Sequence, residues 1–288
     1  MSLRLAVEHF KQMEEDDWKV LYHLSRFIYS FMHVSEEVLS KATGLEAKRL
    51  DYRLRRLHEF GFVGRSRRGY TLLTAGLDAL ALRTLVGKGL ISGMGREIGV
   101  GKEADVYEAV DDEGNRRALK LYRIGRISFR DTRRKRAYSS PLIQHRWLVV
   151  NIRAAGREWK ALKKVHPLGA LVPKPYGRSR HALVLELIDG ALLCEVKELD
   201  DPKGVLMDVL ESLRIAYSAG LINGDLSEFN VLYDGERAWI IDWPQAVRVD
   251  HPNAEELLRR DLSNILRYFR KVGLDYPLEK ALEYVRSV

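Results

Sequence analysis

The chain has 288 residues, of which 46% are hydrophobic and 31% are charged, with a formal net charge of +8. This hydrophobic share excludes a disordered chain, and no run of eighteen apolar residues predicts a membrane span, so no membrane contact is expected. The first 17 residues, with four consecutive acidic side chains, lack the pattern of a secretory signal. The single cysteine, Cys194, cannot form an internal disulfide, which fits a reducing cytoplasm. The positive charge favours an anionic partner, most simply nucleic acid.

Residues 1–84 predict a winged helix-turn-helix domain. Apolar residues recur with helical spacing in three segments, Ser35 is placed to cap the second segment, and Gly44 is placed to end it. Two short apolar runs around an arginine-rich turn then predict a β-hairpin, the wing. We expect helices over residues 17–32, 35–43 and 46–60, and wing strands over 62–64 and 70–72.

The third expected helix and the tip of the wing are both basic, which suits contact with phosphate backbones. The alternative is that these side chains form a solvated basic face of a docking module. The candidate RNA-binding residues are Lys48, Arg49, Arg53 and Arg56 on the helix and Arg65, Arg67 and Arg68 on the wing.

The motif that carries chemistry runs from Asn223 to Asn230, with the sequence NGDLSEFN, and continues as IIDWP over 240–244. The spacing D-x-x-x-x-N, a short hairpin, and then an aspartate after an apolar run is typical of protein-kinase-like enzymes. A hairpin that turns near residue 236 is expected to place Asn230 opposite Asp242. These two residues are predicted to hold one metal ion, while Asp225 faces the incoming hydroxyl group.

A glycine-rich turn between two expected strands precedes this motif and predicts a phosphate-binding loop, because backbone amides of glycine can approach phosphates closely. Ala104 stands where the usual pattern has a third glycine, and Lys120 follows at the distance expected for the lysine that contacts the α- and β-phosphates. Glu158 is the expected carboxylate partner of Lys120, and backbone groups of Glu186 and Ile188 are expected to bind adenine. The predicted nucleotide-binding residues are Gly99, Gly101, Lys102, Glu103, Ala104, Val106, Ala118, Lys120, Glu158, Glu186 and Ile188.

These motifs predict an α+β, bilobal protein-kinase-like fold, with a five-stranded small lobe and a reduced, mainly helical large lobe. We expect a linker over residues 85–95 and the kinase domain over 96–288. Helices are predicted around residues 153–165, 202–219, 253–269 and 278–286.

Together the motifs GKEA at 101–104, GDLSEFN at 224–230 and IDWPQ at 241–245 resemble the Rio-type atypical serine/threonine protein kinases, in particular the subfamily with an N-terminal winged helix. The resemblance covers essentially the whole chain. It implies ATP and Mg²⁺ (or Mn²⁺) as cofactors, with Asp225, Lys120 and Asp242 as catalytic residues and Asn230 and Asp242 as metal ligands. It also implies that Asp242 can itself accept phosphate.

The resemblance further implies a cytoplasmic role in maturation of the small ribosomal subunit, through binding to the precursor particle and its rRNA. A basic insert from Arg123 to Arg136 corresponds to a flexible loop of the family. Ser128 in this insert is the expected autophosphorylation site, and the insert is a second candidate for RNA contact.

One feature departs from the family pattern, and another departs from ordinary kinases. Asn223 stands where the family usually has histidine, and the short segment after Pro244 leaves no room for an activation loop. Two alternatives remain open: a small-molecule phosphotransferase of the aminoglycoside or choline type, and an ATP-sensing regulator that binds nucleic acid. The first would need a long helical insert, for which residues 189–222 are too few.

Overall fold

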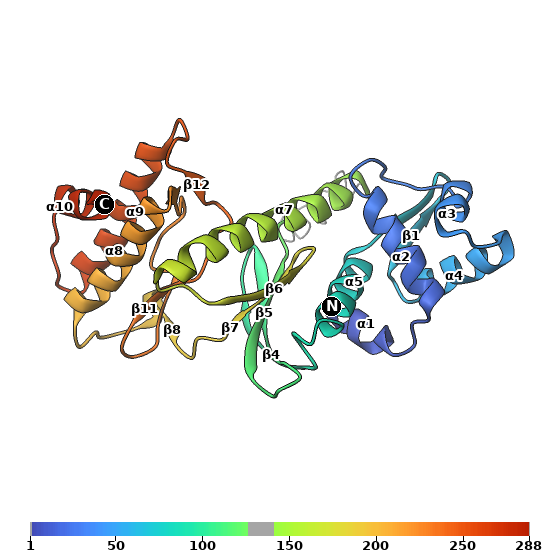
Figure 1. Cartoon of the computed structure of the whole chain (residues 1–288), viewed down its shortest axis with the longest axis horizontal. Helices are drawn as coiled ribbons and strands as arrows, with labels where there is room; N and C mark the ends of the chain where they lie inside the picture. The colour runs from blue at the N-terminus through green and yellow to red at the C-terminus, as the bar shows by residue number, and fades with distance from the viewer. Residues whose placement is uncertain (1, 126–140, 288) are drawn as a thin grey trace, which may run out of the picture. The chain divides into compact units, whose positions relative to one another are not determined.

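The computed structural model describes residues 2–125 and 141–287 (Figure 1). Contacts divide the chain into two compact units. The first comprises Met1–Asn115, Leu119–Arg153 and Arg178–Ala182, and the second Arg116–Ala118, Ala154–Gly177 and Leu183–Val288. Among the described residues no helix is long and apolar enough to cross a membrane. The expected boundaries at residues 84 and 95 stay a prediction.

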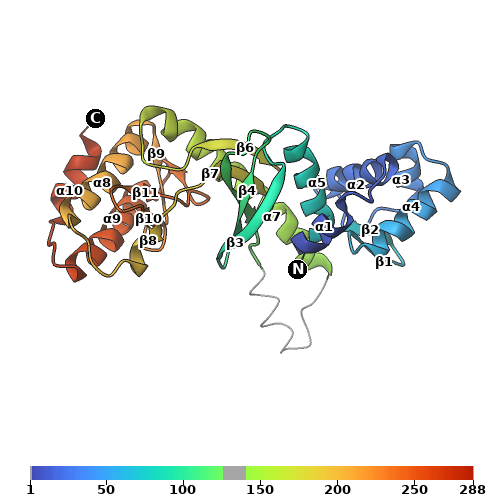
Figure 2. The same cartoon turned by 90° about the horizontal axis from the view of Figure 1, so that it is seen from below.

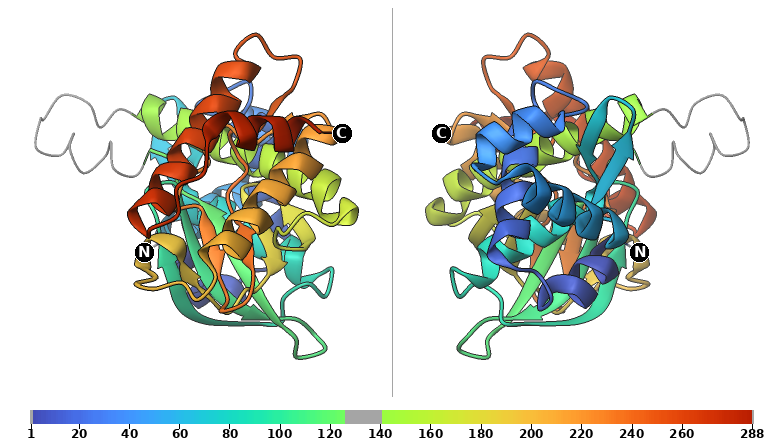
Figure 3. Two further views of the ribbon diagram at one scale, coloured as in Figure 1. Left: turned by 90° about the vertical axis from the view of Figure 1, so that its left-hand side faces the viewer. Right: turned by 90° about the vertical axis from the view of Figure 1, so that its right-hand side faces the viewer.

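The first unit begins with the predicted winged helix-turn-helix. Its elements are α1 (Ser2–Phe10), α2 (Glu15–Phe27), α3 (Glu36–Thr43), α4 (Ala47–Glu59), β1 (Val63–Ser66), β2 (Gly69–Leu72) and α5 (Thr74–Val86). Figure 3 (right) shows these N-terminal helices in blue, facing the viewer. The Ser35 hydroxyl accepts a hydrogen bond from the Val38 amide, and Gly44 ends α3 with a left-handed φ of 66°. Both predicted caps are therefore confirmed, whereas α1, which packs against α5, was not predicted.

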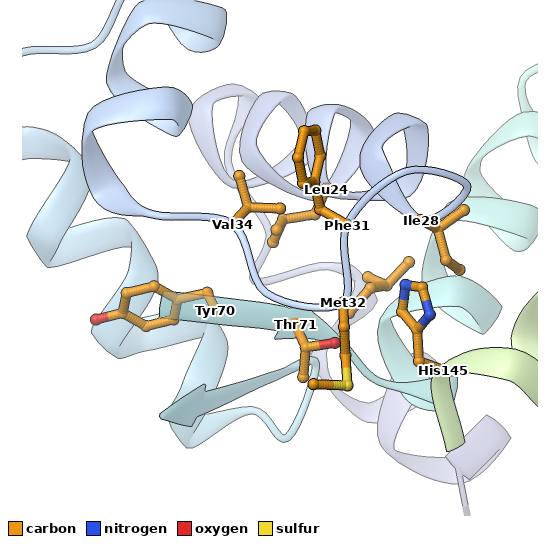
Figure 4. Close-up of a pocket in the computed structure, with 9 residues that line it drawn as sticks. Leu24, Ile28, Phe31, Met32, Val34, Tyr70, Thr71 and His145 are labelled. Atoms are coloured by element: carbon orange, nitrogen blue, oxygen red, sulfur yellow. The ribbon is translucent and has the colours of Figure 1, made fainter. Parts of the chain in front are cut away.

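His145, near the start of α7 (Pro141–Val165), lies beside residues of the wing strand β2. A small apolar pocket lies there, and His145 points toward Met32 and Ile28 (Figure 4). Burial lowers the pKa of His145, and its Nε2 atom has no hydrogen-bond partner among the described residues. The neutral ring therefore acts as a packing group at this position.

The predicted five-stranded sheet is present, in the order β3-β4-β5-β7-β6. Its strands are β3 (Gly93–Val100), β4 (Ala104–Val110), β5 (Arg116–Tyr122), β6 (Pro175–Ser179) and β7 (Ala182–Glu186). The last five residues of β5 are all buried, and so are the first four of β7. Burial on both faces explains the continuous apolar run of β7 over residues 182–185, whereas the buried run of β5 includes one charged residue, Lys120.

The second unit contains the helical lobe (Figure 2). Its helices are α8 (Pro202–Ser218), α9 (Ala254–Lys271) and α10 (Leu278–Arg286), and its short strands are β8 (Ala191–Leu192), β9 (Leu221–Ile222), β10 (Val231–Tyr233), β11 (Ala238–Ile240) and β12 (Val247–Arg248). Two single-turn 3₁₀ helices, His166–Leu168 and Leu193–Glu195, complete the elements. Helix α10 packs on both α8 and α9, which Figure 3 (left) shows toward the viewer.

The predicted hairpin of β10 and β11 forms, but its register differs by one residue from the expectation. Val231 pairs with Ile240, and the Ile241 amide donates to the Asn230 carbonyl at 3.0 Å. Asn230 is therefore opposite Ile241, not opposite Asp242. The cause is the turn, in which the Asp234 carboxylate accepts the amides of residues 236 and 237 and centres the turn between residues 235 and 236.

Candidate active site

The loop between β9 and β10 holds the residues of the NGDLSEFN motif. Gly224 has a φ of 79°, and a Cβ atom there would lie 2.9 Å from the carbonyl oxygen of Gln245. Only glycine satisfies both conditions without strain. The buried Asn223 side chain donates to the Asp242 carbonyl at 2.8 Å and accepts the Asp225 amide at 3.1 Å. Asn223 therefore connects the two aspartates through the backbone, which is a structural role that asparagine fills where histidine was expected.

Asp225 is exposed, but its carboxyl group has an altered acidity. Partial burial of the carboxyl and repulsion from Asp242 raise its pKa, while Arg260 opposes the increase. Arg260 also donates a hydrogen bond to the Gly224 carbonyl. A carboxylate with a raised pKa next to a second carboxylate is the arrangement expected of a proton acceptor beside a cation site.

Asn230 is oriented by its own loop. Its Nδ2 atom donates to the Asp225 carbonyl at 2.7 Å, so its Oδ1 atom is the side-chain atom that can serve as a metal ligand. The Asp242 carboxylate supplies oxygen ligands of the kind that Mg²⁺ prefers. The donor set thus fits a hard divalent cation, which Asn230 and Asp242 would hold.

Asp261 on α9 holds the loop between β9 and β10 and was missed in the sequence analysis. Its two carboxylate oxygens accept the Gly224 amide at 2.6 Å and the Leu226 amide at 3.1 Å. Burial raises the pKa of Asp261 to about 6, against the effect of these two hydrogen bonds. The signal was available, because Asp261 stands between Leu258 and Leu262 on the apolar face of an amphipathic helix.

Glu158 lies on α7 and is fully buried. Its Oε1 atom accepts the backbone amide of Trp243 at 3.4 Å, and the Trp243 indole donates to the Ile240 carbonyl at 3.1 Å. Trp243 is itself fully buried, which fixes the segment after Asp242. The expected ion pair of Glu158 with Lys120 stays a prediction.

In the first unit the predicted phosphate loop is the turn between β3 and β4. The Gly101 amide donates to the Ala104 carbonyl at 2.8 Å, and Gly99 pairs with Val106 across the strands. Lys102 is exposed at the tip of the turn. Lys120 on β5 is buried, and its Nζ atom lies 5.3 Å from the centre of the Tyr122 ring.

The predicted adenine-binding segment follows β7. The Glu186 amide donates to the Lys174 carbonyl at 2.8 Å, and its side chain accepts the Lys174 amide at 3.1 Å. The Glu186 amide and side chain are therefore used within the fold. This leaves the Glu186 carbonyl as the backbone group for a base, with Ile188 two residues further on.

The basic residues of α4 have acidic partners that the sequence analysis did not foresee. Arg53 contacts Glu14 at 2.7 Å and is nearly buried, and Arg56 contacts Glu14 and lies 3.1 Å from Asp17. Arg49 pairs with Asp16. The acidic run over residues 14–17, which caps and begins α2, thus offsets much of the positive charge on α4.

The wing-tip residues differ from those of α4. Arg65, Arg67 and Arg68 are exposed, and within the described residues none of the three forms an ion pair. Ser128 lies outside the described residues.

Arg123 was expected to begin the basic insert, and this expectation was wrong. Its guanidinium is buried and pairs with Asp78 on α5 at 2.8 Å and with Asp105 on β4 at 3.2 Å. The physical reason is that Arg123 directly follows a strand whose last residues point into the core. Arg123 is therefore a buried structural residue and does not belong to a surface that can contact RNA.

Comparison with known proteins agrees with this architecture. Residues 105–282 match the RIO domain, and residues 10–88 match the Rio2 N-terminal domain. The chain is 38% identical over 264 residues to the RIO-type serine/threonine-protein kinase Rio2 of Methanocaldococcus jannaschii, covering 87% of this chain and 96% of that protein. It is 35% identical to the serine/threonine-protein kinase RIO2 of Caenorhabditis elegans, covering 96% of this chain but only 53% of that protein.

Among solved structures, the chain superposes with a TM-score of 0.83 on the Rio2 kinase from Chaetomium thermophilum in a complex with ADP, Mg²⁺ and phosphoaspartate. Sequence identity is 29%, and the alignment covers 98% of this chain and 89% of that one. A second Rio2 kinase structure from that organism gives a TM-score of 0.80 at 30% identity. The chain therefore belongs to the RIO family of serine/threonine protein kinases, with an N-terminal domain of the Rio2 type.

Proposed function

We propose that this chain transfers the terminal phosphoryl group of ATP at a site built from Asp225, Asn230 and Asp242. The observation that carries the proposal is the loop geometry, in which Asn223 ties Asp225 to Asp242 while Asp261 holds the loop backbone. This arrangement presents two carboxylates and one amide oxygen together. It is an arrangement that phosphoryl transfer uses for positioning and charge neutralisation.

Each residue then has a distinct role. Asp225 orients the attacking hydroxyl group or water and accepts its proton, for which a raised pKa is suited. Asn230 and Asp242 hold Mg²⁺ or Mn²⁺, and the bound metal neutralises charge on the phosphates. Lys120 contacts the phosphates, and the turn around Gly101 covers them.

We further propose that Asp242 accepts phosphate during turnover. The Rio2 kinase of C. thermophilum has been solved as a phosphoaspartate complex, which supports this reading. A carboxylate oxygen of Asp242 would form the new bond to phosphorus as the bond to ADP breaks, with no net proton transfer. The acyl phosphate would be seen as an added phosphate in intact-protein mass spectra that hydroxylamine removes.

The cellular role we propose is ATP-dependent maturation of the small ribosomal subunit, in the cytoplasm and on the precursor particle and its rRNA. The net charge of +8 and the exposed wing arginines support a partner that contains RNA. Autophosphorylation, with Ser128 as the candidate residue, belongs to the same proposal.

The test of the enzymatic proposal is ATP hydrolysis by the wild type and by Asp225→Ala. We expect the variant to bind ATP normally and to lose turnover by roughly two to four orders of magnitude, the scale of general-base loss. Equal loss of ATP binding and turnover would instead assign Asp225 a structural role and reject the proposed chemistry.

A further inference from the structure

Away from the proposed active site, the first unit contains a cavity of about 380 Å³. It is lined by Tyr22, Ser25, Arg26 and Tyr29 from α2 and its C-terminal extension, Leu77 from α5, Ile152 from α7 and Arg180 from the turn between β6 and β7. Its volume lies within the roughly 300–1,000 Å³ range of small-ligand sites. None of these residues has a role in phosphoryl transfer.

Arg180 is the unusual member of this lining. Its backbone φ is 53°, and no other non-glycine residue in the described chain has a positive φ. The left-handed backbone conformation strains an L-residue by roughly 1–2 kcal/mol. Glycine or asparagine would adopt it with less strain in this two-residue turn. A strained backbone at an arginine marks this position as a candidate functional site.

The charge of Arg180 is also uncompensated. Its Nη1 atom donates to three neutral acceptors, the Leu80 carbonyl at 3.1 Å, the Ser179 hydroxyl at 3.2 Å and the Thr84 hydroxyl at 3.3 Å. No described carboxylate forms an ion pair with it. Burial lowers the pKa of Arg180, and the titratable groups that favour its charged form are Tyr22 and Tyr29. A partly buried cation without a counter-ion is costly, and an anionic ligand would relieve that cost.

Two further features suit a ligand that combines a negative charge with an aromatic ring. Arg26 is exposed at the cavity and, among described residues, has no ion-pair partner. Tyr22 and Tyr29 are large aromatic side chains that remain 45% and 57% exposed. Exposed tyrosines beside arginines are the chemistry by which proteins stack bases and bind the adjacent phosphate.

We propose that this cavity binds one nucleotide, with the base stacked on Tyr22 or Tyr29 and its phosphate on Arg26 and Arg180. The nucleotide comes from a single-stranded RNA segment or is a free mononucleotide. The strand source rests on the proposed RNA contact of this chain, whereas the site itself does not depend on the proposed phosphoryl transfer. It adds to the wing an RNA-binding position that the sequence did not indicate.

The first arm of the test measures binding of the full chain to a fluorescein-labelled uridine decamer by anisotropy at several salt concentrations. The Tyr22→Ala, Tyr29→Ala double variant should bind roughly tenfold more weakly, because stacking is removed. The corresponding double phenylalanine variant keeps both rings and should bind within about threefold of the wild type. If the phenylalanine and alanine variants lose equal affinity, stacking is rejected and the proposal with it.

The arginines are tested by Arg26→Ala and Arg180→Gly, with Lys88→Ala as the matched control because Lys88 is exposed in the same unit. Arg180→Gly relieves the positive φ, so thermal unfolding should show a folded protein while binding weakens. Each arginine variant should flatten the salt slope by roughly 0.7, and the control should not. If both arginine variants bind the decamer as tightly as Lys88→Ala does, the proposal is overturned.

The second arm identifies the source of the nucleotide by calorimetric titration with uridine 5′-monophosphate. Saturable binding that the double alanine variant abolishes assigns a free mononucleotide. If the chain binds the decamer but not uridine 5′-monophosphate, the nucleotide comes from a single-stranded RNA segment. All cavity variants should keep wild-type ATP turnover, and Asp225→Ala should keep wild-type RNA binding, so this proposal and the enzymatic one fail in different assays. If neither probe binds in a cavity-dependent way, the site is rejected.

Discussion

The two carboxylates of the proposed site have different surroundings. Asp225 is exposed on a loop fixed by Gly224, whereas Asp242 is partly buried and is followed by the fully buried Trp243 and by Pro244, which has no amide to donate. The segment after Asp242 is therefore held on one side by the Glu158 contact and by packing. An aspartate on a fixed segment, if it binds the proposed metal, needs little reorganisation when the cation arrives.

Asp242→Asn should abolish metal-dependent ATP turnover, because the amide lacks the negative charge that offsets a divalent cation. The measurement is ATP hydrolysis across a range of Mg²⁺ and Mn²⁺ concentrations. Asp250→Asn is the matched control, since Asp250 is an exposed carboxylate paired with Arg248 at 2.7 Å. Near-normal turnover in Asp242→Asn would show that the metal is held elsewhere.

Asp261 allows a prediction about pH. Its pKa in the folded protein is about 6, above the ordinary value of 3.8, so the folded state holds this proton more tightly than the unfolded state. The associated stability is present below about pH 4 and is lost as the pH rises through about 6. Asp261→Asn should remove this dependence, and denaturant unfolding of both proteins at about pH 4 to 7 measures it.

The same variant should also lose turnover, because the Gly224 and Leu226 amides bond to different carboxylate oxygens of Asp261, and asparagine replaces one of these oxygens with an NH₂ group that cannot accept. Unfolding curves that stay parallel to those of the wild type at every pH would contradict the assignment of the raised pKa to Asp261.

At the scale of elements, α4 and the wing are both rich in arginine, but their arginines have different partners. Glu14 bonds to Arg53 and Arg56, which lowers the pKa of Glu14 to about 2, and burial raises the pKa of the neighbouring Asp17. Helix α4 is thus joined to the start of α2 by charge pairs. The wing tip carries arginines without such partners among the described residues, so the wing is the stronger candidate for phosphate contact.

Because the wing arginines lack these partners, substituting them should have a different effect from substituting the arginines of α4. Arg67→Ala with Arg68→Ala should flatten the salt dependence of RNA binding, by roughly 0.7 to 0.9 in log–log slope for each phosphate that the protein no longer neutralises. Arg53→Ala with Arg56→Ala should mainly lower the melting temperature, because Arg53 is nearly buried and Asp17 is fully buried beside it. Salt titrations and thermal unfolding of both pairs test this. An unchanged slope in the wing pair would reject the wing as an RNA surface.

At the scale of the molecule, one buried charge cluster joins segments that are far apart in the sequence. Asp78 on α5 bonds to Arg123 after β5 and to His181 before β7, at 2.8 Å in each case. Arg123 also bonds to Asp105, and its amide donates to the Glu103 carbonyl in the phosphate loop at 2.6 Å. The helix that ends the winged domain is thereby connected to the loop expected to cover ATP.

Asp78→Asn should destabilise the first unit by about 3–5 kcal/mol, the usual cost of removing one partner of a buried pair. Burial alone would raise the pKa of Asp78, but Arg123 and His181 hold it well below its usual range. A depressed carboxyl pKa gives stability that is present above the unfolded pKa and is lost as the pH falls. The difference in melting temperature between wild type and variant should therefore shrink in acid.

Asp51→Asn is the control for this prediction, because Asp51 forms an exposed i,i+4 pair with Arg55 that contributes only about 0.3–0.5 kcal/mol. Equal melting-temperature shifts in Asp51→Asn and Asp78→Asn would show that the buried cluster does not join these segments.

The sequence by itself determined the family, the winged helix followed by a kinase-like fold with a five-stranded sheet, and the motif that suggests the site. It did so because these depend on local rules: helical and strand periodicity, the caps at Ser35 and Gly44, and the fixed spacing from Asp225 to Asn230. Helix α10, for example, was predicted to its observed ends at Leu278 and Arg286.

Only the tertiary structure decided which charges meet. Residues separated by 30 or more positions meet in the pairs of Arg53 with Glu14 and of Arg123 with Asp78, in the hydrogen bond from the Gly224 amide to Asp261, and in the contact of Arg180 with the Leu80 carbonyl beside the cavity. The sequence shows how many charges a segment has but not what lies across from them. Pairing and burial set the free energy of each charge, so they decide whether an arginine stabilises the fold or remains available to a ligand.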